Sequence, residues 1–545
     1  MKRFLLLLVL LALLLPTLAL TAQDDAPTES DLPWWNDRVF YEIFVRSFYD
    51  SDGDGIGDLQ GVISQLDYLN DGDPTTDSDL GITGIWLMPI NPSPSYHGYD
   101  VTDYLGVNSE YGTLDDMRQL IEEAHARGIA VIIDFVLNHS SVEHEWFIES
   151  QNPDSDFRDY YVWEDENPGF RGPEGQQVWY QTAGRYYYAV FWSGMPDLNY
   201  ANPDLTAQMM EASRFWIEDI GVDGFRLDAI KFLISDGERQ ENTPETVAWF
   251  EAYRASLRES NADNLLVGEI WDSTSTVSSY TDRAVDIAFE FDLAAGIVRG
   301  AAFGITSSID SALETVLESY PAGQYATFLT NHDQDRVMNQ LRGEVGSAKS
   351  AAAVILTLPG VPFIYYGEEI GMVGVKPDED IRTPMQWSDG ENAGFTGGDP
   401  WRAVNADFAD GVNVAAQSDD ANSLLTHYRA LIHARNENPA LLRGDITVID
   451  SGSGNVISFL RHTADQTVLV VINMRPREVD NYGLTLESSV LSDLTNINLM
   501  LASSHEPFEA DGAFALPELN AEGGFADYLP LPVLPGNSVF ILEFE

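Results

Sequence analysis

The residues best suited to chemistry lie in residues 221–232, GVDGFRLDAIKF. Phe225 and Leu227 alternate with Arg226 and Asp228, the pattern of a short strand with one apolar and one charged face. Burying both charges is costly unless they pair, and an Arg two residues before an Asp lies on the same side of a strand. Arg226 is therefore expected to hold Asp228 ionised, the state that a carboxylate nucleophile requires. A purely structural ion pair would explain this segment equally well.

Other polar side chains follow further short apolar runs that we expect to be strands. They are Asp134, Asn138, His139, Glu269, His332 and Asp333, joined by His97 and Tyr99 of the segment YHGYD. In a closed parallel barrel, the carboxyl ends of the strands and the loops after them form one face. Carboxylates and imidazoles gathered at one face predict an active site, because separate solvated loops share no reason to collect them there.

A rhythm of short apolar runs and amphipathic stretches predicts the elements that position these residues. Strands are expected at residues 39–45, 84–88, 130–136, 224–227, 265–269, 286–289, 326–329 and 362–366, with helices between them at 114–126, 205–219 and 244–258. Eight such alternations predict an α/β fold, a closed (β/α)8 TIM barrel, better than an open sheet.

The spacing of these elements predicts three folded parts. We assign residues 34–138 and 201–435 to the barrel, with a last helix at 423–435. Residues 139–200 are too long for a plain loop, so an inserted subdomain B is expected after the third strand. Short alternating strands such as 456–461 and 467–473 predict a separate all-β domain, a C-terminal β-sandwich, at 436–545.

The N-terminus is expected to direct export. Lys2 and Arg3 precede an apolar run at 4–20, and small residues follow where a signal peptide would be cut. We predict a signal peptide at 1–22, a flexible lead-in at 23–33, and a secreted protein with no stable membrane insertion after cleavage. An uncleaved anchor is the alternative, although the run is marginal for a membrane span. The chain has no cysteine, so no disulfide stabilises it.

The composition is strongly acidic, with 87 Asp and Glu, 29 Lys and Arg, and a formal net charge of −58. Such a surface repels nucleic acid and anionic membranes, so neither is expected as a partner. The many carboxylates and few lysines predict function in salty surroundings, where self-repulsion is screened over a few Å.

Five short motifs carry a family resemblance. They are DFVLNH at 134–139, GFRLDAIKF at 224–232, GEIW at 268–271, FLTNHD at 328–333 and MPDLN at 195–199. The first four resemble, in order and spacing, the signature regions of the α-amylase family, glycoside hydrolase family 13. MPDLN is similar to the fifth region of an intermediary group between α-amylases and neopullulanases or oligo-1,6-glucosidases.

This resemblance implies retaining hydrolysis of an α-glucoside through a covalent glycosyl-aspartate. Asp228 takes the position of the nucleophile, Glu269 that of the acid/base, and Asp333 that of the carboxylate that stabilises an oxocarbenium-like transition state. Retention requires the first two carboxyl groups to lie about 5–5.5 Å apart. The implied substrate contacts are His97, Tyr99, His139, Arg226, Lys231, His332 and Arg336.

Two departures from the family pattern bear on specificity. Residue 229 is Ala, where a Val accompanies α-1,6 preference in related glucosidases, so Ala229 favours α-1,4 bonds. Phe232 replaces a histidine found in many α-amylases, which weakens the case for endo-acting starch cleavage. We expect a hydrolase of α-1,4 bonds in starch, maltodextrin or maltooligosaccharides. The alternatives are a trehalose synthase or transglycosylase, an oligo-1,6-glucosidase-like exo-glucosidase and, more remotely, a non-catalytic membrane-anchored barrel.

The segment DSDGDGIGD, residues 50–58, predicts a structural Ca²⁺ site. Its oxygen ligands would be the side chains of Asp50, Asp52, Asp54 and Asp58 and the carbonyl of Ile56. Gly61 stands where an EF-hand has a bidentate Glu, so a complete EF-hand is not expected, but similar loops bind Ca²⁺ in oligo-1,6-glucosidase relatives. An acidic turn without metal is the alternative. Asn138 takes the position at which many α-amylases hold a second Ca²⁺.

The segments IRTPMQWS at 381–388 and NAGFT at 392–396 resemble loops of oligosaccharide-acting and trehalose-forming members of the family. Trp387 and Phe395 either wall the acceptor side of the site or pack in the interior, and the sequence favours neither.

Overall fold

The structure is a computed structural model that describes residues 32–504 and 514–545. The predicted signal peptide and most of the predicted lead-in lie outside the described residues. No helix within the described ranges combines the length and apolar character needed to cross a bilayer.

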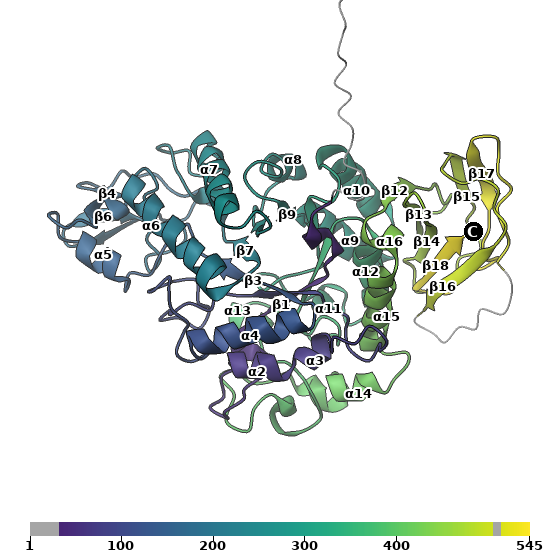
Figure 1. The fold of residues 1–545 in the computed structure, drawn as a ribbon, viewed down its shortest axis with the longest axis horizontal. Helices are drawn as coiled ribbons and strands as arrows, with labels where there is room; N and C mark the ends of the chain where they lie inside the picture. The colour runs from purple at the N-terminus through teal and green to yellow at the C-terminus, as the bar shows by residue number, and fades with distance from the viewer. Residues whose placement is uncertain (1–31, 505–513) are drawn as a thin grey trace, which may run out of the picture.

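Eight parallel strands close into a barrel at the centre of the molecule (Figure 1), in the order β1-β11-β10-β9-β8-β7-β3-β2. They are β1 (Phe40–Ile43), β2 (Gly84–Leu87), β3 (Ala130–Phe135), β7 (Gly224–Leu227), β8 (Leu265–Gly268), β9 (Ile287–Phe289), β10 (Tyr325–Thr327) and β11 (Val361–Tyr365). Each lies at one of the predicted positions, with ends that differ by a few residues. The predicted (β/α)8 fold is confirmed.

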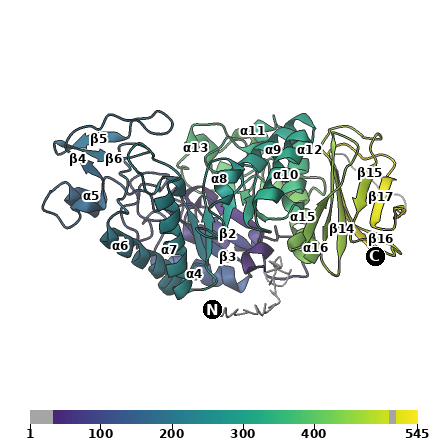
Figure 2. The same cartoon turned by 90° about the horizontal axis from the view of Figure 1, so that it is seen from above.

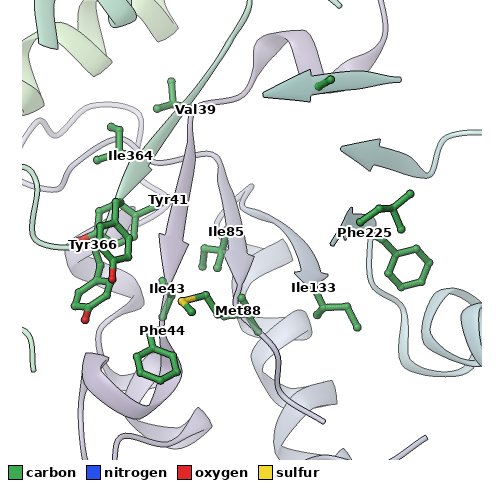
Figure 3. Close-up of a cluster of buried hydrophobic side chains, with 14 of the residues drawn as sticks. Val39, Tyr41, Ile43, Phe44, Ile85, Met88, Ile133, Phe225, Ile364 and Tyr366 are labelled. Atoms are coloured by element: carbon green, nitrogen blue, oxygen red, sulfur yellow. The ribbon is translucent and has the colours of Figure 1, made fainter. Parts of the chain in front are cut away.

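Alternation along the strands divides the apolar residues between two cores. Phe40, Trp86 and Phe363 point into the barrel, where the rings of Phe40 and Phe363 stack at 4.7 Å. Ile85 and Ile133, at the intervening positions, belong to the larger buried cluster shown in Figure 3. The apolar barrel interior leaves polar residues only toward the carboxyl ends of the strands.

Helices follow the strands and surround the barrel. They are α1 (Val45–Phe48), α2 (Leu59–Ser64), α3 (Leu66–Leu69), α4 (Leu114–Ala126), α6 (Pro203–Arg214), α7 (Pro244–Ser260), α8 (Thr274–Ser278), α9 (Phe291–Phe303), α10 (Ser307–Ser319), α11 (Val337–Gln340), α12 (Val345–Thr357), α13 (Asp378–Ile381), α14 (Val414–Ser418), α15 (Leu424–Glu437) and α16 (Pro439–Leu442). The local sequence explains where several of these helices begin. Thr113 and Asp116 form a capping box for α4, and Thr243 caps α7 ahead of a proline at its first position.

One predicted helix changes type along its length. The helix expected at 205–219 is α6 followed by a π-helical turn, η4 (Phe215–Ile220), which ends at Gly221 with a positive φ of 96°. Short 3-10 turns occur at η2 (Trp34–Asp37), η3 (Arg158–Tyr160), η5 (Ile230–Phe232), η6 (Glu391–Gly394) and η7 (Ala406–Asp410).

Two further parts lie at opposite ends of the long axis, as Figures 1 and 2 both show. The segment after β3 holds α5 (Glu145–Ser150) and a sheet of β4 (Trp163–Glu164), β6 (Arg185–Tyr188) and β5 (Trp179–Thr182). The C-terminal part is all β. It has a sheet in the order β12 (Asp445–Val448), β13 (Val456–His462), β14 (Thr467–Asn473), β18 (Ser538–Phe544), β16 (Ile497–Ser503), and a pair of β15 (Leu484–Ser488) with β17 (Gly523–Tyr528).

Candidate active site

Strand register brings the predicted site residues together at one end of the barrel. Asp134 of β3 pairs directly with Arg226 of β7. Both alternate with apolar residues that face outward, so their side chains point into the barrel above its apolar layers. Asp228 follows β7 and Glu269 follows β8, at the same end.

Arg226 is the centre of this cluster. Its side chain is fully buried, and its Nη1 donates to Asp134 Oδ2 and to Asp228 Oδ1, each at 2.8 Å. Its Nη2 lies 2.7 Å from Glu269 Oε2. One planar guanidinium therefore contacts three carboxyl groups, and it fixes Asp228 and Glu269 side by side.

A single cation does not neutralise three carboxyl groups, and the pKa values of the two that are buried, Asp134 and Asp228, reflect this. Burial raises the pKa of Asp134 to about 6, although Arg226 opposes the shift. Burial also raises the pKa of Asp228 well above its ordinary value, with Arg226 opposing and Glu269 and Asp134 adding to the rise. Arg226 lowers the pKa of Asp228, as expected, but burial outweighs it because the charge of Arg226 is shared among three carboxyl groups. The cluster as a whole favours retaining a proton.

The backbone after Asp228 also binds Glu269. Ala229 has a positive φ of 49°, a conformation that is uncommon for residues other than glycine. In this conformation its N–H donates to Glu269 Oε2 at 3.0 Å. The turn after the first carboxylate thus orients the second, while Glu269 still lines the open cavity.

Asp333, the third predicted carboxylate, is contacted by Arg382 and His332. Arg382 Nη2 lies 2.8 Å from its Oδ1, and His332 Nε2 lies 3.4 Å from its Oδ2. Burial raises the pKa of Asp333, but His332, Arg382 and Arg226 outweigh that effect and lower it to about 2. Asp333 is consequently ionised at any ordinary pH.

A buried hydrogen-bond chain connects Asp333 to the barrel interior. His332 Nε2 and Tyr99 Oη are 2.6 Å apart, and Tyr99 donates to Asp134 Oδ2 at 2.9 Å. His332 Nδ1 contacts Glu42 of β1. Burial raises the pKa of Glu42 and lowers that of His332, so the neutral form of both is favoured.

The cluster opens into a cavity of about 570 Å³. Its lining includes Asp228, Glu269 and Asp333 with the predicted contacts His97, Tyr99, His139 and Lys231. Arg226 and His332 lie directly beneath this surface. His139 is buried, and its Nε2 has no hydrogen-bond partner among the described residues, which leaves it available to a substrate hydroxyl. A larger cavity of about 700 Å³, between α10 and β13, contains none of these residues.

The structure places one predicted contact elsewhere. Arg336 is buried, donates to the carbonyls of Ile381 and Tyr366 at 2.9 and 2.7 Å, and does not line the cavity. It holds the chain after β11 instead. The guanidinium that lines the cavity is that of Arg382, in the segment 381–388.

Trp387 and Phe395 pack in the interior and do not wall the acceptor side of the site. Trp387 donates from Nε1 to Phe48 O at 2.8 Å and packs against the ring of Tyr68, while Phe395 is fully buried. Neither lines the cavity. Sequence reasoning also missed Glu42, Trp192 and Trp271; a glutamate in the middle of an apolar barrel strand was the signal available for the first.

The acidic loop at residues 50–58 has a donor set that fits Ca²⁺ in part. Carboxylate oxygens of Asp50, Asp52 and Asp58 lie within 4.8 Å of one another, and none of the three forms an ion pair with another described residue. Three carboxylates without a cationic side chain between them suit a hard divalent cation. Asp54 does not join them; its Oδ1 accepts from Ile56 N at 2.8 Å.

Asn138, the position suggested for a second Ca²⁺, has different surroundings from those of the acidic loop. Asn138 Nδ2 lies 3.3 Å from Asp197 Oδ2, and burial raises the pKa of Asp197 to about 7. Among the described residues, no three acidic or histidine side chains converge on Asn138 as they do in the loop at 50–58.

Comparison with known proteins gives consistent matches. A family model described as alpha amylase, catalytic domain, matches residues 42–444. Alpha-amylase 3 of Dictyoglomus thermophilum is 39% identical over 448 residues, 81% of this chain and 85% of the relative. An oligo-1,6-glucosidase of Parageobacillus thermoglucosidasius is 33% identical over 522 residues, 81% of this chain and 90% of the relative. The crystal structure of an alpha-amylase from H. orenii is 41% identical, has a TM-score of 0.79, and covers 93% of this chain and 99% of its own.

Proposed function

Because the chain belongs to the α-amylase family of glycoside hydrolases, we propose that it is a retaining α-glucan hydrolase that cleaves mainly α-1,4 bonds in starch, maltodextrin or maltooligosaccharides. One observation carries this proposal. Asp228 and Glu269 both contact Arg226 at the wall of one cavity, and Asp333 lines the same cavity.

In the first step Asp228 attacks the anomeric carbon while Glu269 gives its proton to the glycosidic oxygen, so the bond between that carbon and that oxygen breaks. The step requires Glu269 to carry a proton and Asp228 to be ionised. Ionised Asp333 faces the positive charge that develops on the sugar ring, and His139 donates to a hydroxyl of the same sugar.

In the second step water replaces the leaving sugar. Glu269, now ionised, takes a proton from the water, whose oxygen bonds to the anomeric carbon as the bond to Asp228 breaks. Both the product and the substrate then have the α configuration. The contacts of Glu269 with Arg226 Nη2 and Ala229 N hold its carboxyl group on the same side for both steps.

A second candidate is an exo-glucosidase of the oligo-1,6 type. It is favoured by the similarity to the oligo-1,6-glucosidase and by Phe232, which lines the cavity where many α-amylases have a histidine. Ala229 favours α-1,4 bonds in turn, since its small side chain at the cavity wall leaves room beside the nucleophile.

The proposal includes a structural Ca²⁺ held by Asp50, Asp52 and Asp58, and secretion directed by the N-terminal segment. When bound, the ion would neutralise three converging carboxylates close to the start of α2. Its place is structural, and no step of the reaction depends on it.

Chromatography of early products from starch and maltotriose, with NMR of the first anomer released, tests the proposal. We expect maltooligosaccharides released as α-anomers; glucose alone would favour the exo-glucosidase, and trehalose an isomerase. Glu269→Gln should lose about 10²- to 10⁴-fold in kcat. A β-anomer as first product, or full activity of Glu269→Gln, would contradict the retaining mechanism.

A further inference from the structure

Two arginines between the barrel and the C-terminal part are buried without a carboxylate partner. Arg435 of α15 and Arg461 of β13 are fully buried, and neither forms an ion pair with another described residue. In a chain with a formal net charge of −58, an arginine that lacks an acidic partner is unexpected. A buried cation is costly unless an opposite charge compensates it, so this pair requires an explanation.

The two guanidiniums bind backbone carbonyls instead of carboxylates. Arg435 donates from Nη1 to Leu356 O at 3.0 Å and to Leu358 O at 2.9 Å. Arg461 donates from Nη1 to Thr357 O at 2.7 Å. These carbonyls end α12, and the end of a helix supplies only about half a negative charge. A structural role as caps of α12 therefore leaves more than one positive charge unbalanced.

The pKa values of the two arginines reflect this imbalance. Burial, together with the neighbouring charge of Arg435, lowers the pKa of Arg461 to about 9. Burial also lowers the pKa of Arg435 to about 10. Asp445 acts on Arg461 and Asp37 acts on Arg435 in the opposite direction, but burial outweighs both. An anion bound beside the pair would supply the charge that the chain does not.

A cavity of about 490 Å³ lies against these charges. Arg461 lines it, and so does Gly360, whose carbonyl accepts from Arg435 Nη2 at 2.7 Å. Tyr325 lines it as well, and its buried Oη has no hydrogen-bond partner among the described residues. Arg435 Nε has no such partner either. Unused donors beside an unbalanced positive charge are suited to an anion that accepts several hydrogen bonds.

The cavity lies at the end of the barrel opposite the catalytic carboxylates. Tyr325 begins β10 and Gly360 precedes β11, whereas Asp445 and Arg461 belong to β12 and β13 of the C-terminal part. Asp445 is the acidic residue of this wall, and it is exposed, so water screens its charge. Arg443, also on the wall, pairs with an aspartate outside it. The wall therefore favours a negatively charged ligand.

We propose that this cavity binds a small inorganic oxyanion of the sulfate or phosphate class, held by Arg461 and the hydroxyl of Tyr325, and that the anion joins the barrel to the C-terminal β domain. Each terminal nitrogen of Arg461 carries two N–H groups, and a carbonyl accepts from each nitrogen, Thr357 O at 2.7 Å and Gly444 O at 2.8 Å. The remaining N–H groups form a fork that matches two oxygens of a tetrahedral anion.

The test is thermal unfolding of the full protein in increasing sodium sulfate and, separately, sodium phosphate, with sodium chloride keeping the ionic strength constant. We expect a saturable rise in the melting temperature of about 2 °C at ten times the dissociation constant. Tyr325→Phe removes the unpartnered hydroxyl and keeps the ring, so it should weaken the apparent affinity about tenfold. Arg461→Gln should abolish the saturable rise.

Tyr253→Phe is the matched control. Tyr253 is also fully buried, but its hydroxyl lies 2.8 Å from Ser213 Oγ and does not line the cavity, so the variant should bind sulfate like the unmodified protein. Sulfate and phosphate also strengthen burial by exclusion from protein surfaces, an effect that does not saturate and is the same in every variant.

Three results would overturn the proposal. The first is a rise in melting temperature that does not saturate in the unmodified protein. The second is equal affinity for sulfate in Tyr325→Phe and the unmodified protein, which would show that the hydroxyl does not contact the anion. The third is saturation by chloride with no further effect of sulfate or phosphate, which would show that the cavity does not select oxyanions.

Discussion

Replacing Arg382 by Gln should remove the shortest ion-pair contact that the structure gives to the Asp333 carboxylate. The Arg382 side chain is 3% exposed, and its Nη2 lies 2.8 Å from Asp333 Oδ1. Hydrogen bonds to charged groups contribute about 1.5–3 kcal/mol, and we take about 1.5 kcal/mol because a third of the Asp333 side chain is open to water. If this contact acts in the transition state, kcat/KM should fall about tenfold.

The same substitution should move the acid limb of the pH profile. Asp333 has a pKa of about 2, because His332, Arg382 and Arg226 together outweigh its burial. Activity that requires ionised Asp333 is present above this pKa and is lost as the pH falls through it. About 1.5 kcal/mol corresponds to about one pKa unit, so the variant should lose activity at a pH about one unit higher.

The assay is kcat/KM on maltotriose from about pH 2 to about pH 7, a range that spans both expected pKa values, with thermal unfolding measured at each pH. Lys376→Gln is the matched control, since the Lys376 side chain contacts Asp378 and has the weakest effect of the four side chains that lower the pKa of Asp333. We expect the control to stay within about twofold of the unmodified protein. An Arg382→Gln variant that is folded, equally active and unchanged in its acid limb would refute the reasoning.

Other regions of the molecule give three further predictions. Burial raises the pKa of Glu368 to about 8, so the folded protein keeps a proton that the unfolded chain releases above about pH 4.3. Stability should therefore fall as the pH rises between these values, by at most about 1.4 kcal/mol per pH unit, and Glu368→Gln should flatten this slope in thermal unfolding; an unchanged slope would contradict the assignment. Ala229→Val puts a β-branched residue at a φ of 49°, so it should cost about 1–3 kcal/mol of stability. It should also lower the ratio of α-1,4 to α-1,6 hydrolysis, measured on maltose and isomaltose. An unaltered ratio would rule out a role for residue 229 in the choice of linkage. Chelation should lower the melting temperature and added Ca²⁺ restore it, with a smaller response in Asp52→Asn; equal melting temperatures with and without the ion would rule out a structural calcium.

The sequence was sufficient to predict the barrel strands and most of the carboxylate cluster of the candidate active site. A strand repeats every two residues, so the alternation of Phe225, Arg226, Leu227 and Asp228 already determines which side chains face inward. Closing the strands into a barrel then brings their carboxyl ends to one rim whatever the length of chain between them. The meeting of Asp228 and Glu269 at one guanidinium therefore follows from local pattern and fold class together.

Only the tertiary structure decided which arginine reaches Asp333 and how the buried charges are shared. Arg336 is three residues from Asp333 in sequence, yet its guanidinium turns to the carbonyls of Ile381 and Tyr366, while Arg382, on a distant loop, contacts the carboxylate. Loop paths depend on contacts with the whole surrounding surface, and no local periodicity encodes them. The charge state of Asp228 depends likewise on the sum of all charges enclosed with it, because water screens little of their interaction in the interior.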